Sequence, residues 1–148
     1  MPNTESSAGF IIFRKAGNKR LYLILYYSIG HWDFVKGKIE QGETETQAAM
    51  RECREETGIT DIKILDGFRE KITYHFKRAG KFVTKDAVFF LAETQQDKVM
   101  LSNEHQGFRW LEYAEAYELT TFETGRQLLK KANAFLDENS KQKKLFSF

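Results

Sequence analysis

The sequence predicts an α/β protein of layered type. Apolar runs rich in β-branched and aromatic residues are interrupted by one segment with helical spacing, and a second helical segment closes the chain. This order is typical of layered α/β domains. The length of 148 residues fits one domain with a single core. We therefore expect one domain over residues 1–148, with frayed ends at residues 1–6 and 140–148.

Strands are expected wherever the chain is apolar and β-rich, at residues 7–14, 21–27, 62–74, 81–94 and 108–111. The turn residues Ala16-Gly17-Asn18 separate the first two of these segments, and Arg78-Ala79-Gly80 separates the next two. Glycines at positions 30, 37 and 42 break the pattern between them. Residues 28–42 are therefore predicted to be mostly loop.

Two segments favour helices. Residues 44–57 contain no glycine or proline, Thr44 and Gln47 have the spacing of a capping box, and Gly58 stands where a helix-ending glycine belongs. The second helix is expected at residues 122–139, where one apolar stripe is formed by Leu128, Leu129, Ala132, Phe135 and Leu136.

The composition excludes several classes of protein. With 41% hydrophobic and 30% charged residues, the chain is neither disordered nor membranous, and no apolar run approaches the roughly 20 residues of a membrane span. The polar N-terminus and a single cysteine, Cys53, favour a cytoplasmic location. The net charge of +2 does not mark a nucleic-acid-binding protein, and we interpret the lysines at 141, 143 and 144 as a solvated tail.

Three glutamates in the first helical segment suggest chemistry. At 100° per residue, Glu52, Glu55 and Glu56 fall within an arc of about 100°. The side that we expect to be buried carries Cys53, with Met50 and Thr57 near it. Three like charges at this spacing destabilise an isolated helix, but they are favourable around a hard divalent cation such as Mg²⁺. Taken alone, the three residues also fit a solvated, Glu-rich helix face.

A longer pattern surrounds these glutamates. Gly37 is followed by Glu43 and by the run Arg51-Glu52-Cys53-Arg54-Glu55-Glu56-Thr57-Gly58-Ile59. This pattern closely resembles the Nudix box, which has Gly, Glu, Arg-Glu, Glu-Glu and Gly at these spacings. Seven fixed residues with usages of about 5–7% arise by accident at a rate on the order of 10⁻⁸ per starting position. Cys53 departs from the usual aliphatic residue, and we expect it to pack in the core.

The resemblance implies a Nudix fold, in which a mixed central β-sheet is sandwiched between helices (α/β/α). It also implies that Glu52, Glu55 and Glu56 bind Mg²⁺, or Mn²⁺ in its place, with a backbone carbonyl near Gly37 as a further ligand. Catalytic roles are implied for Glu55 and for Arg51. Arg51 is expected to pair with Glu43 and to brace the loop against the helix.

Other segments resemble the asymmetrical diadenosine tetraphosphate hydrolases of the animal and archaeal type, from about residue 7 to residue 136. These segments are His31-Trp32-Asp33-Phe34-Val35-Lys36-Gly37 and Ser102-Asn103-Glu104-His105-Gln106. The resemblance makes Glu104 a candidate metal ligand or general base. It also implies a substrate-binding set in which Phe89 stacks on adenine and four residues face the polyphosphate: His31, Lys36, Tyr74 and Lys85. Each member of this set also has an ordinary structural interpretation, as a loop cap, a strand-surface residue or, for Phe89, a core ring.

The expected activity is Mg²⁺-dependent hydrolysis of diadenosine tetraphosphate to ATP and AMP, by attack of water on a bridge phosphorus. The expected partner is therefore a small-molecule dinucleoside polyphosphate. The alternatives are a 5′-RNA pyrophosphohydrolase, a hydrolase of another nucleoside diphosphate derivative, and a non-catalytic Nudix domain that only binds a nucleotide. The weak net charge favours the small molecule over RNA. The complete set of box glutamates favours an enzyme over a binding-only domain.

Overall fold

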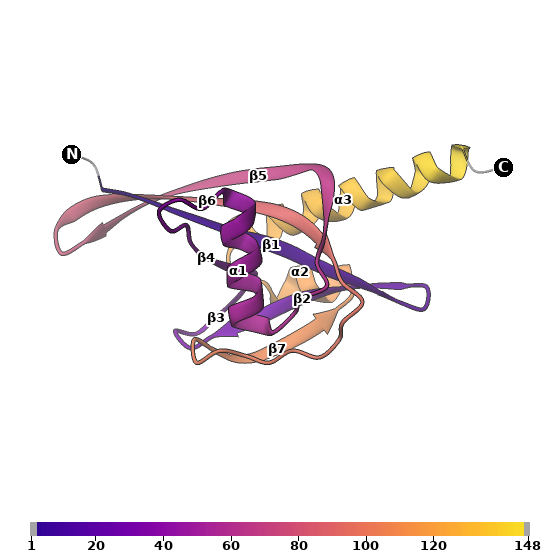
Figure 1. The fold of residues 1–148 in the computed structure, drawn as a ribbon, viewed down its shortest axis with the longest axis horizontal. Helices are drawn as coiled ribbons and strands as arrows, with labels where there is room; N and C mark the ends of the chain where they lie inside the picture. Colours follow the sequence, from indigo (N-terminus) through magenta and orange to yellow (C-terminus); the bar gives the residue numbers. More distant parts are fainter. Residues whose placement is uncertain (1–2, 147–148) are drawn as a thin grey trace.

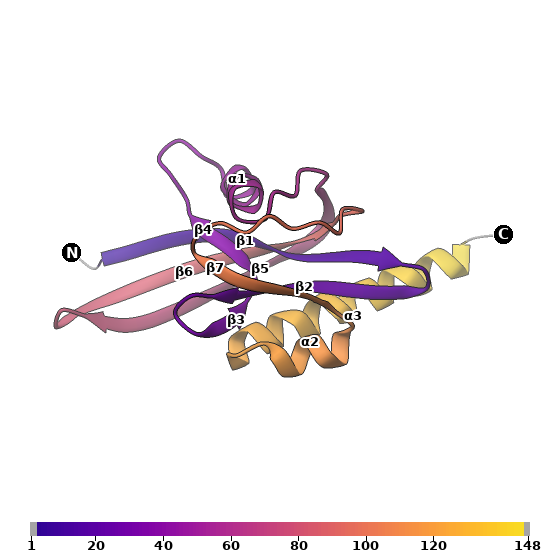
Figure 2. The ribbon, with the colours of Figure 1, turned by 90° about the horizontal axis from the view of Figure 1, so that it is seen from below.

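The chain forms a mixed β-sheet covered by helices on both faces (Figure 1). The computed structural model describes the backbone of residues 3–146 and the side chains of residues 4–143. The strands are β1 (Asn3–Ala16), β2 (Lys19–Tyr27), β3 (His31–Asp33), β4 (Val35–Lys38), β5 (Lys63–Arg78), β6 (Lys81–Glu93) and β7 (His105–Leu111). The helices are α1 (Glu45–Thr57), α2 (Tyr113–Leu119) and α3 (Glu123–Phe146). Figure 2 shows α1 on one face of the sheet and α2 and α3 on the other, so the predicted α/β/α sandwich is confirmed.

The sheet opens into a fork between its two N-terminal strands. The strand order is β3-β2-β1-β6-β5; β1 pairs with β6 in parallel, and the other pairs are antiparallel. β1 and β2 pair only near the turn that joins them, from Phe13↔Tyr22 to Ala16↔Lys19. Away from this turn, β1 pairs with β4 while β2 pairs with β3 and β7. The ends of several strands therefore meet around the open side of the fork.

Two apolar clusters pack on the two faces of the sheet. In β1, Phe10 and Ile12 face one cluster and Ile11 and Phe13 face the other, as the alternation of side chains along a strand requires. The first cluster includes Ala48, Ala49 and Cys53 of α1, and the second includes Leu128, Leu129 and Ala132 of α3. Because both faces are covered, β1 is apolar over consecutive positions rather than at alternate ones.

Both ends of α1 are fixed by the signals that the sequence predicted. Thr44 Oγ1 accepts a hydrogen bond from Gln47 N at 3.1 Å, and Gln47 Oε1 accepts one from Thr44 N at 2.9 Å, which completes the capping box. Gly58 adopts φ 72°, a left-handed conformation that favours glycine, and its N–H donates to Arg54 O. The helix that carries the box glutamates therefore begins and ends at defined residues.

Several predicted boundaries are wrong. Residues 28–42 are mostly loop as predicted, but two short strands within them, β3 and β4, were not predicted and cover seven of the fifteen residues. The expected fraying of residues 1–6 is wrong for residues 3–6, since β1 pairs with β6 from Asn3↔Val83 onward. The expected fraying of residues 140–148 is wrong for residues 140–146, which continue α3. Residues 1–2 and 147–148 lie outside the described part of the chain.

The short helix α2 was not predicted. It has seven residues, and no side chain caps its first turn, so it carries few of the local signals that mark a helix in sequence. Lys141 and Lys143 of the predicted basic tail are exposed residues of α3. Within the described residues, no helix is both long enough and apolar enough to span a membrane.

We predict that Cys53→Val lowers the free energy of unfolding by no more than about 1.5 kcal/mol, because Cys53 is a completely buried member of the cluster under α1 and the substitution nearly conserves volume. Chemical denaturation measures this difference. The native thiol should also resist thiol reagents, because burial raises its pKa to about 11. Rapid labelling of Cys53 in the folded protein would contradict this placement.

Candidate active site

A cavity of about 450 Å³ lies where the fork opens, and most of the predicted site residues line it. It takes its walls from the ends of β1, β2 and β4, from β6, from α1 and from the turn before β7. The predicted residues that it brings together are His31, Lys36, Gly37, Glu52, Glu56, Lys85 and Glu104. The structure therefore assembles seven of the predicted residues from five separate segments of the chain.

Four glutamates line this cavity; Glu5 pairs with Arg78, and the other three are candidate metal ligands. Glu52 and Glu56 come from successive turns of α1, and Glu104 comes from the turn before β7. Glu56 is only 4% exposed, and its Oε2 has no hydrogen-bond partner among the described residues. Burial, followed by the charges of Glu52 and Glu104, raises the pKa of Glu56 to about 9. A buried carboxylate beside two others becomes stable in its charged form only when a cation compensates it.

Gly37 gives the backbone of β4 access to these carboxylates. A Cβ atom at this position would lie 2.0 Å from Glu52 Cδ, far inside van der Waals contact. Any side chain here would therefore displace the Glu52 carboxylate. This close approach explains why the pattern has glycine at position 37, and it leaves the backbone beside the carboxylates open to a ligand.

The donors in the cavity fit a hard divalent cation. Carboxylate and backbone oxygens are the ligands that Mg²⁺ and Mn²⁺ prefer, and the unpartnered Oε2 of Glu56 provides one such atom. Within the described residues, no group of three His, Cys, Asp or Glu side chains is close enough together to hold an ion. Mg²⁺ retains several of its waters, however, so one or two carboxylates can be sufficient. Glu52, Glu56 and Glu104 are therefore the candidates, of which one or two could hold the ion directly.

Glu55 differs from the other two box glutamates. Its side chain is 55% exposed, it does not line the cavity, and its Oε2 accepts a hydrogen bond from Arg51 Nη1 at 3.2 Å. The prediction that all three glutamates project together is therefore wrong. The helix instead buries Glu56 with Cys53 and turns Glu55 towards solvent.

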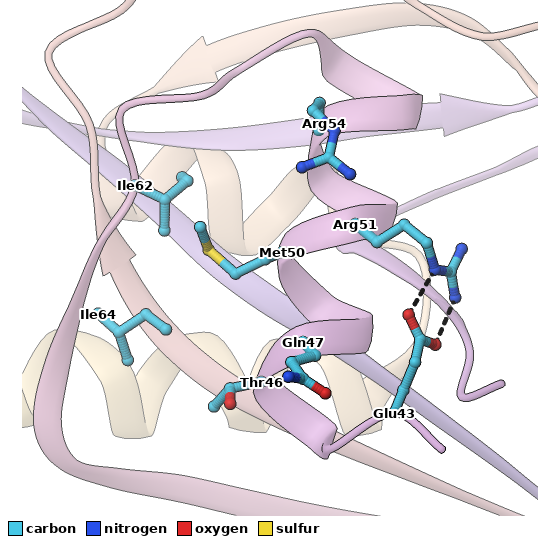
Figure 3. Close-up of a pocket in the computed structure, with 8 residues that line it drawn as sticks. All are labelled: Glu43, Thr46, Gln47, Met50, Arg51, Arg54, Ile62 and Ile64. Carbon is cyan, nitrogen blue, oxygen red and sulfur yellow. Dashed lines mark hydrogen bonds and ion pairs between the residues drawn. The ribbon is translucent and has the colours of Figure 1, made fainter. Parts of the chain in front are cut away.

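Arg51 forms the predicted brace and lies outside the cavity. Its guanidinium donates to both carboxylate oxygens of Glu43, at 2.7 and 2.9 Å (Figure 3). It also donates to Lys38 O at 2.9 Å and to Glu52 Oε1 at 2.8 Å. Arg51 thus connects the loop after β4 to α1 and orients Glu52, so its role is to position other residues. The prediction that Arg51 acts directly in catalysis does not match this location. The groove in Figure 3, on the outer side of α1, contains none of the cavity carboxylates.

Lys36 and Lys85 bring positive charge to the same cavity. Lys36 Nζ lies 3.2 Å from Asp33 Oδ2 and 5.5 Å from the centre of the Tyr27 ring. Burial, followed by the charge of Lys36, lowers the pKa of Lys85. Two lysines close enough to repel each other favour binding of a polyanion, whose charge removes that repulsion. A cavity that holds both lysines and carboxylates is suited to a phosphate chain accompanied by a cation.

The aromatic residues are arranged differently from the prediction. Phe89 is 1% exposed, and its ring packs against Phe34 in the core with 6.1 Å between ring centres. The prediction that Phe89 stacks on adenine is therefore wrong. Tyr74 is half-buried against the same core and does not line the cavity, although it pairs with Lys85 in the β5–β6 register.

Two aromatic residues that were not predicted contact His31 at the cavity. Tyr27 lines the cavity; its ring stacks on His31 at 4.9 Å, and its hydroxyl donates to Phe34 O at 2.6 Å. Phe122 is 49% exposed and does not line the cavity itself, but its ring centre lies 5.1 Å from that of His31. Phe122 precedes α3, and no local pattern connects it with residue 31. Tyr27 carried a weak signal, because it ends a strand just before the glycine-rich segment.

Comparisons with known proteins agree with this geometry. The NUDIX domain family model matches residues 4–132. An asymmetrical bis(5'-nucleosyl)-tetraphosphatase from Mus musculus is 37% identical over 142 residues, covering 88% of this chain and 94% of the relative. An RNA pyrophosphohydrolase from Hydrogenovibrio crunogenus is 28% identical over 126 residues, covering 72% and 73%. The solved binary complex of a C. elegans Ap4A hydrolase superposes with a TM-score of 0.82 at 35% identity, covering 90% of this chain and 98% of that one.

We predict that Gly37→Ala weakens Mn²⁺ binding about tenfold or more while the protein stays folded, because the new methyl group displaces the flexible end of Glu52. Electron paramagnetic resonance of free Mn²⁺ measures the affinity, and thermal unfolding checks the fold. Gly107→Ala is the matched control, since a Cβ there meets its nearest neighbour at an ordinary 3.7 Å. Wild-type Mn²⁺ affinity in Gly37→Ala would contradict the assigned role of this glycine.

A second prediction concerns pH. Between pH of about 4.5 and 9, Glu56 keeps a proton in the folded protein that it loses in the unfolded chain, so rising pH favours unfolding. Without divalent cations, Glu56→Gln should therefore gain thermal stability relative to wild type as the pH rises from 5 to 8.5. Adding Mg²⁺ at pH 8.5 should stabilise the wild type more than the variant. If the difference in melting temperature between wild type and Glu56→Gln stayed constant over this pH range, Glu56 would be ionised at neutral pH without help from a cation.

Proposed function

Because the chain belongs to the NUDIX family, we propose that it hydrolyses diadenosine tetraphosphate to ATP and AMP, with Mg²⁺ or Mn²⁺ as cofactor. The observation that carries this proposal is the shared cavity of Glu52, Glu56 and Glu104 with Lys36 and Lys85. The similarity to the mouse tetraphosphatase over 88% of this chain supports the substrate class.

The carboxylates are assigned to the cation. Glu52, Glu56 and Glu104 would hold it beside the backbone at Gly37. When bound, such a cation stabilises negative charge on the phosphates and activates water for in-line attack. The backbone N–H of Glu104 donates to Ser102 Oγ at 3.4 Å, and the residue lies in an exposed turn. Its carboxylate is therefore free to take part in proton transfer, and we assign it as the candidate general base.

Four residues in or beside the cavity are assigned to substrate binding. Lys36 and Lys85 neutralise the phosphates that lie away from the scissile bond. Burial lowers the pKa of His31, so its ring is neutral and donates a hydrogen bond rather than a charge. Phe122, in place of Phe89, offers an exposed ring beside His31 on which an adenine can stack. Binding energy from these remote contacts positions the reacting phosphorus.

Product analysis tests the proposal. With Mg²⁺, diadenosine tetraphosphate should be cleaved faster than ATP or diadenosine triphosphate and should give ATP and AMP. In heavy-oxygen water the label should enter AMP, because attack falls on the phosphorus that leaves with the shorter fragment. Two molecules of ADP would refute the asymmetric cut, and faster release of pyrophosphate from triphosphorylated RNA would establish the RNA pyrophosphohydrolase instead.

Paired phenylalanine variants locate the base-binding ring in the same assay. Phe122→Ala should lower kcat/KM for diadenosine tetraphosphate about tenfold, since base stacking on an aromatic ring contributes roughly 1–3 kcal/mol. Phe82→Ala removes a more exposed ring (70%, against 49% for Phe122) that makes no ring contact with His31 among the described residues, and its kinetics should match wild type. Equal kinetics for the two variants would remove Phe122 from the substrate site.

A further inference from the structure

His105 is a buried histidine that faces the carboxylate of Glu56. It is the first residue of β7, and its side chain is completely inaccessible to solvent. Its Nε2 lies 3.8 Å from Glu56 Oε2. Neither of these two buried atoms has a hydrogen-bond partner among the described residues. Two unpartnered polar atoms that face each other across a gap this short can satisfy each other after a small shift of either side chain.

Ser102 ties the imidazole to the helix that carries Glu56. The Ser102 N–H donates to Glu56 O at 3.3 Å, and Ser102 O accepts from His105 N at 3.2 Å. Ser102 Oγ lies 3.3 Å from His105 Nδ1. The same serine thus contacts the backbone of Glu56 and both the backbone and the ring of His105. These contacts fix the direction in which Nε2 points.

A neighbouring aromatic ring holds the imidazole in place. The Tyr27 ring packs edge-on against His105 with 4.3 Å between centres, so one side of the imidazole is blocked. A neutral imidazole has one N–H donor and one acceptor nitrogen. A donor to Nδ1 therefore leaves the proton on Nε2.

We propose that His105 is a positioning residue for Glu56: Ser102 donates to Nδ1, and the Nε2–H group donates to Glu56 Oε2, which leaves the other carboxylate oxygen to bind the cation. Partners of this kind set the orientation of metal-binding carboxylates, and their loss typically weakens metal affinity 10–100-fold. The inference rests on the cation assignment made under the proposed function. It does not depend on the identity of the nucleotide substrate.

Two amide variants separate positioning from packing. In His105→Gln, the side-chain nitrogen reaches the place of Nε2, whereas in His105→Asn it reaches only the place of Nδ1. Both variants lose the ring and its contact with Tyr27, so a purely structural role predicts equal effects. We expect Mn²⁺ affinity, measured by electron paramagnetic resonance, to fall about tenfold in His105→Asn and about threefold or less in His105→Gln.

Kinetics give a second readout. His105→Asn should need more Mg²⁺ for half-maximal activity, and saturating Mg²⁺ should restore most of kcat without a change in the KM for substrate. Equal losses of Mn²⁺ affinity in the Asn and Gln variants, or none in either, would overturn the proposal. Glu56→Gln serves as the reference: wild-type Mn²⁺ binding in that variant would instead refute the cation site itself.

The wild-type protein allows a test that does not depend on the folding of a variant. In protein labelled with ¹⁵N-histidine, the His105 signals report which ring nitrogen carries the proton. We expect the proton on Nε2, and we expect the Nε2 signal to shift when Mg²⁺ is added. A proton on Nδ1, or a His105 signal that does not respond to Mg²⁺, would overturn the proposal.

Discussion

The burial of Glu56 beside Glu52 and Glu104 is the constraint to which the rest of the site responds. A carboxylate that is 4% exposed and has like charges as neighbours opposes folding when it is ionised. The fold accommodates it because α1 is fixed by its two caps and by apolar packing around Cys53. Under the proposed function, a divalent cation among these oxygens would relieve the repulsion, so that the unfavourable cluster would serve as its binding site.

Arg51 determines which of the glutamates are compensated by positive charge from the protein itself. Its guanidinium neutralises Glu43 through two short hydrogen bonds from Nε and Nη2. The third nitrogen, Nη1, donates to both Glu52 and Glu55. Glu56 lies one turn beyond Glu52, and Arg51 makes no hydrogen bond or ion pair with it among the described residues. One arginine thus pins the loop after β4 to α1 and leaves a single buried carboxylate unpaired. The spacing of the box places the stabilised and the uncompensated glutamates on the same two turns of helix.

The parts of this architecture that were predictable are those with local causes. Thr44, Gln47 and Gly58 act on the backbone of their own helix, so both ends of α1 follow from sequence. The error at Phe89 has a different origin: where both faces of the sheet are covered, consecutive positions of β6 from Ala87 to Ala92 are apolar, and a core ring there has the same sequence signature as a ligand-binding ring. Glu55 was predicted to face the same site as Glu52 and Glu56, because the three residues fall within an arc of about 100° on the helix. An arc this wide includes both side chains that enter the cavity and one that points to solvent. The contact of Phe122 with His31 joins segments 91 residues apart, and tertiary packing alone creates it.

The fork between β1 and β2 explains why this site can hold opposite charges close together. If the two strands stayed paired along their length, Lys36 and Glu56 would be separated by the sheet. Because β1 turns away to pair with β4 and β6, Gly37 reaches the helix while Lys36, the residue before it, points to the other side of the strand. Adjacent residues of one short strand thus serve the same cavity in two ways. Gly37 lets the backbone approach the carboxylates, and Lys36 provides a positively charged ammonium group. Under the proposed function, this alternation would let lysine meet the phosphate oxygens while glutamate meets the metal ion.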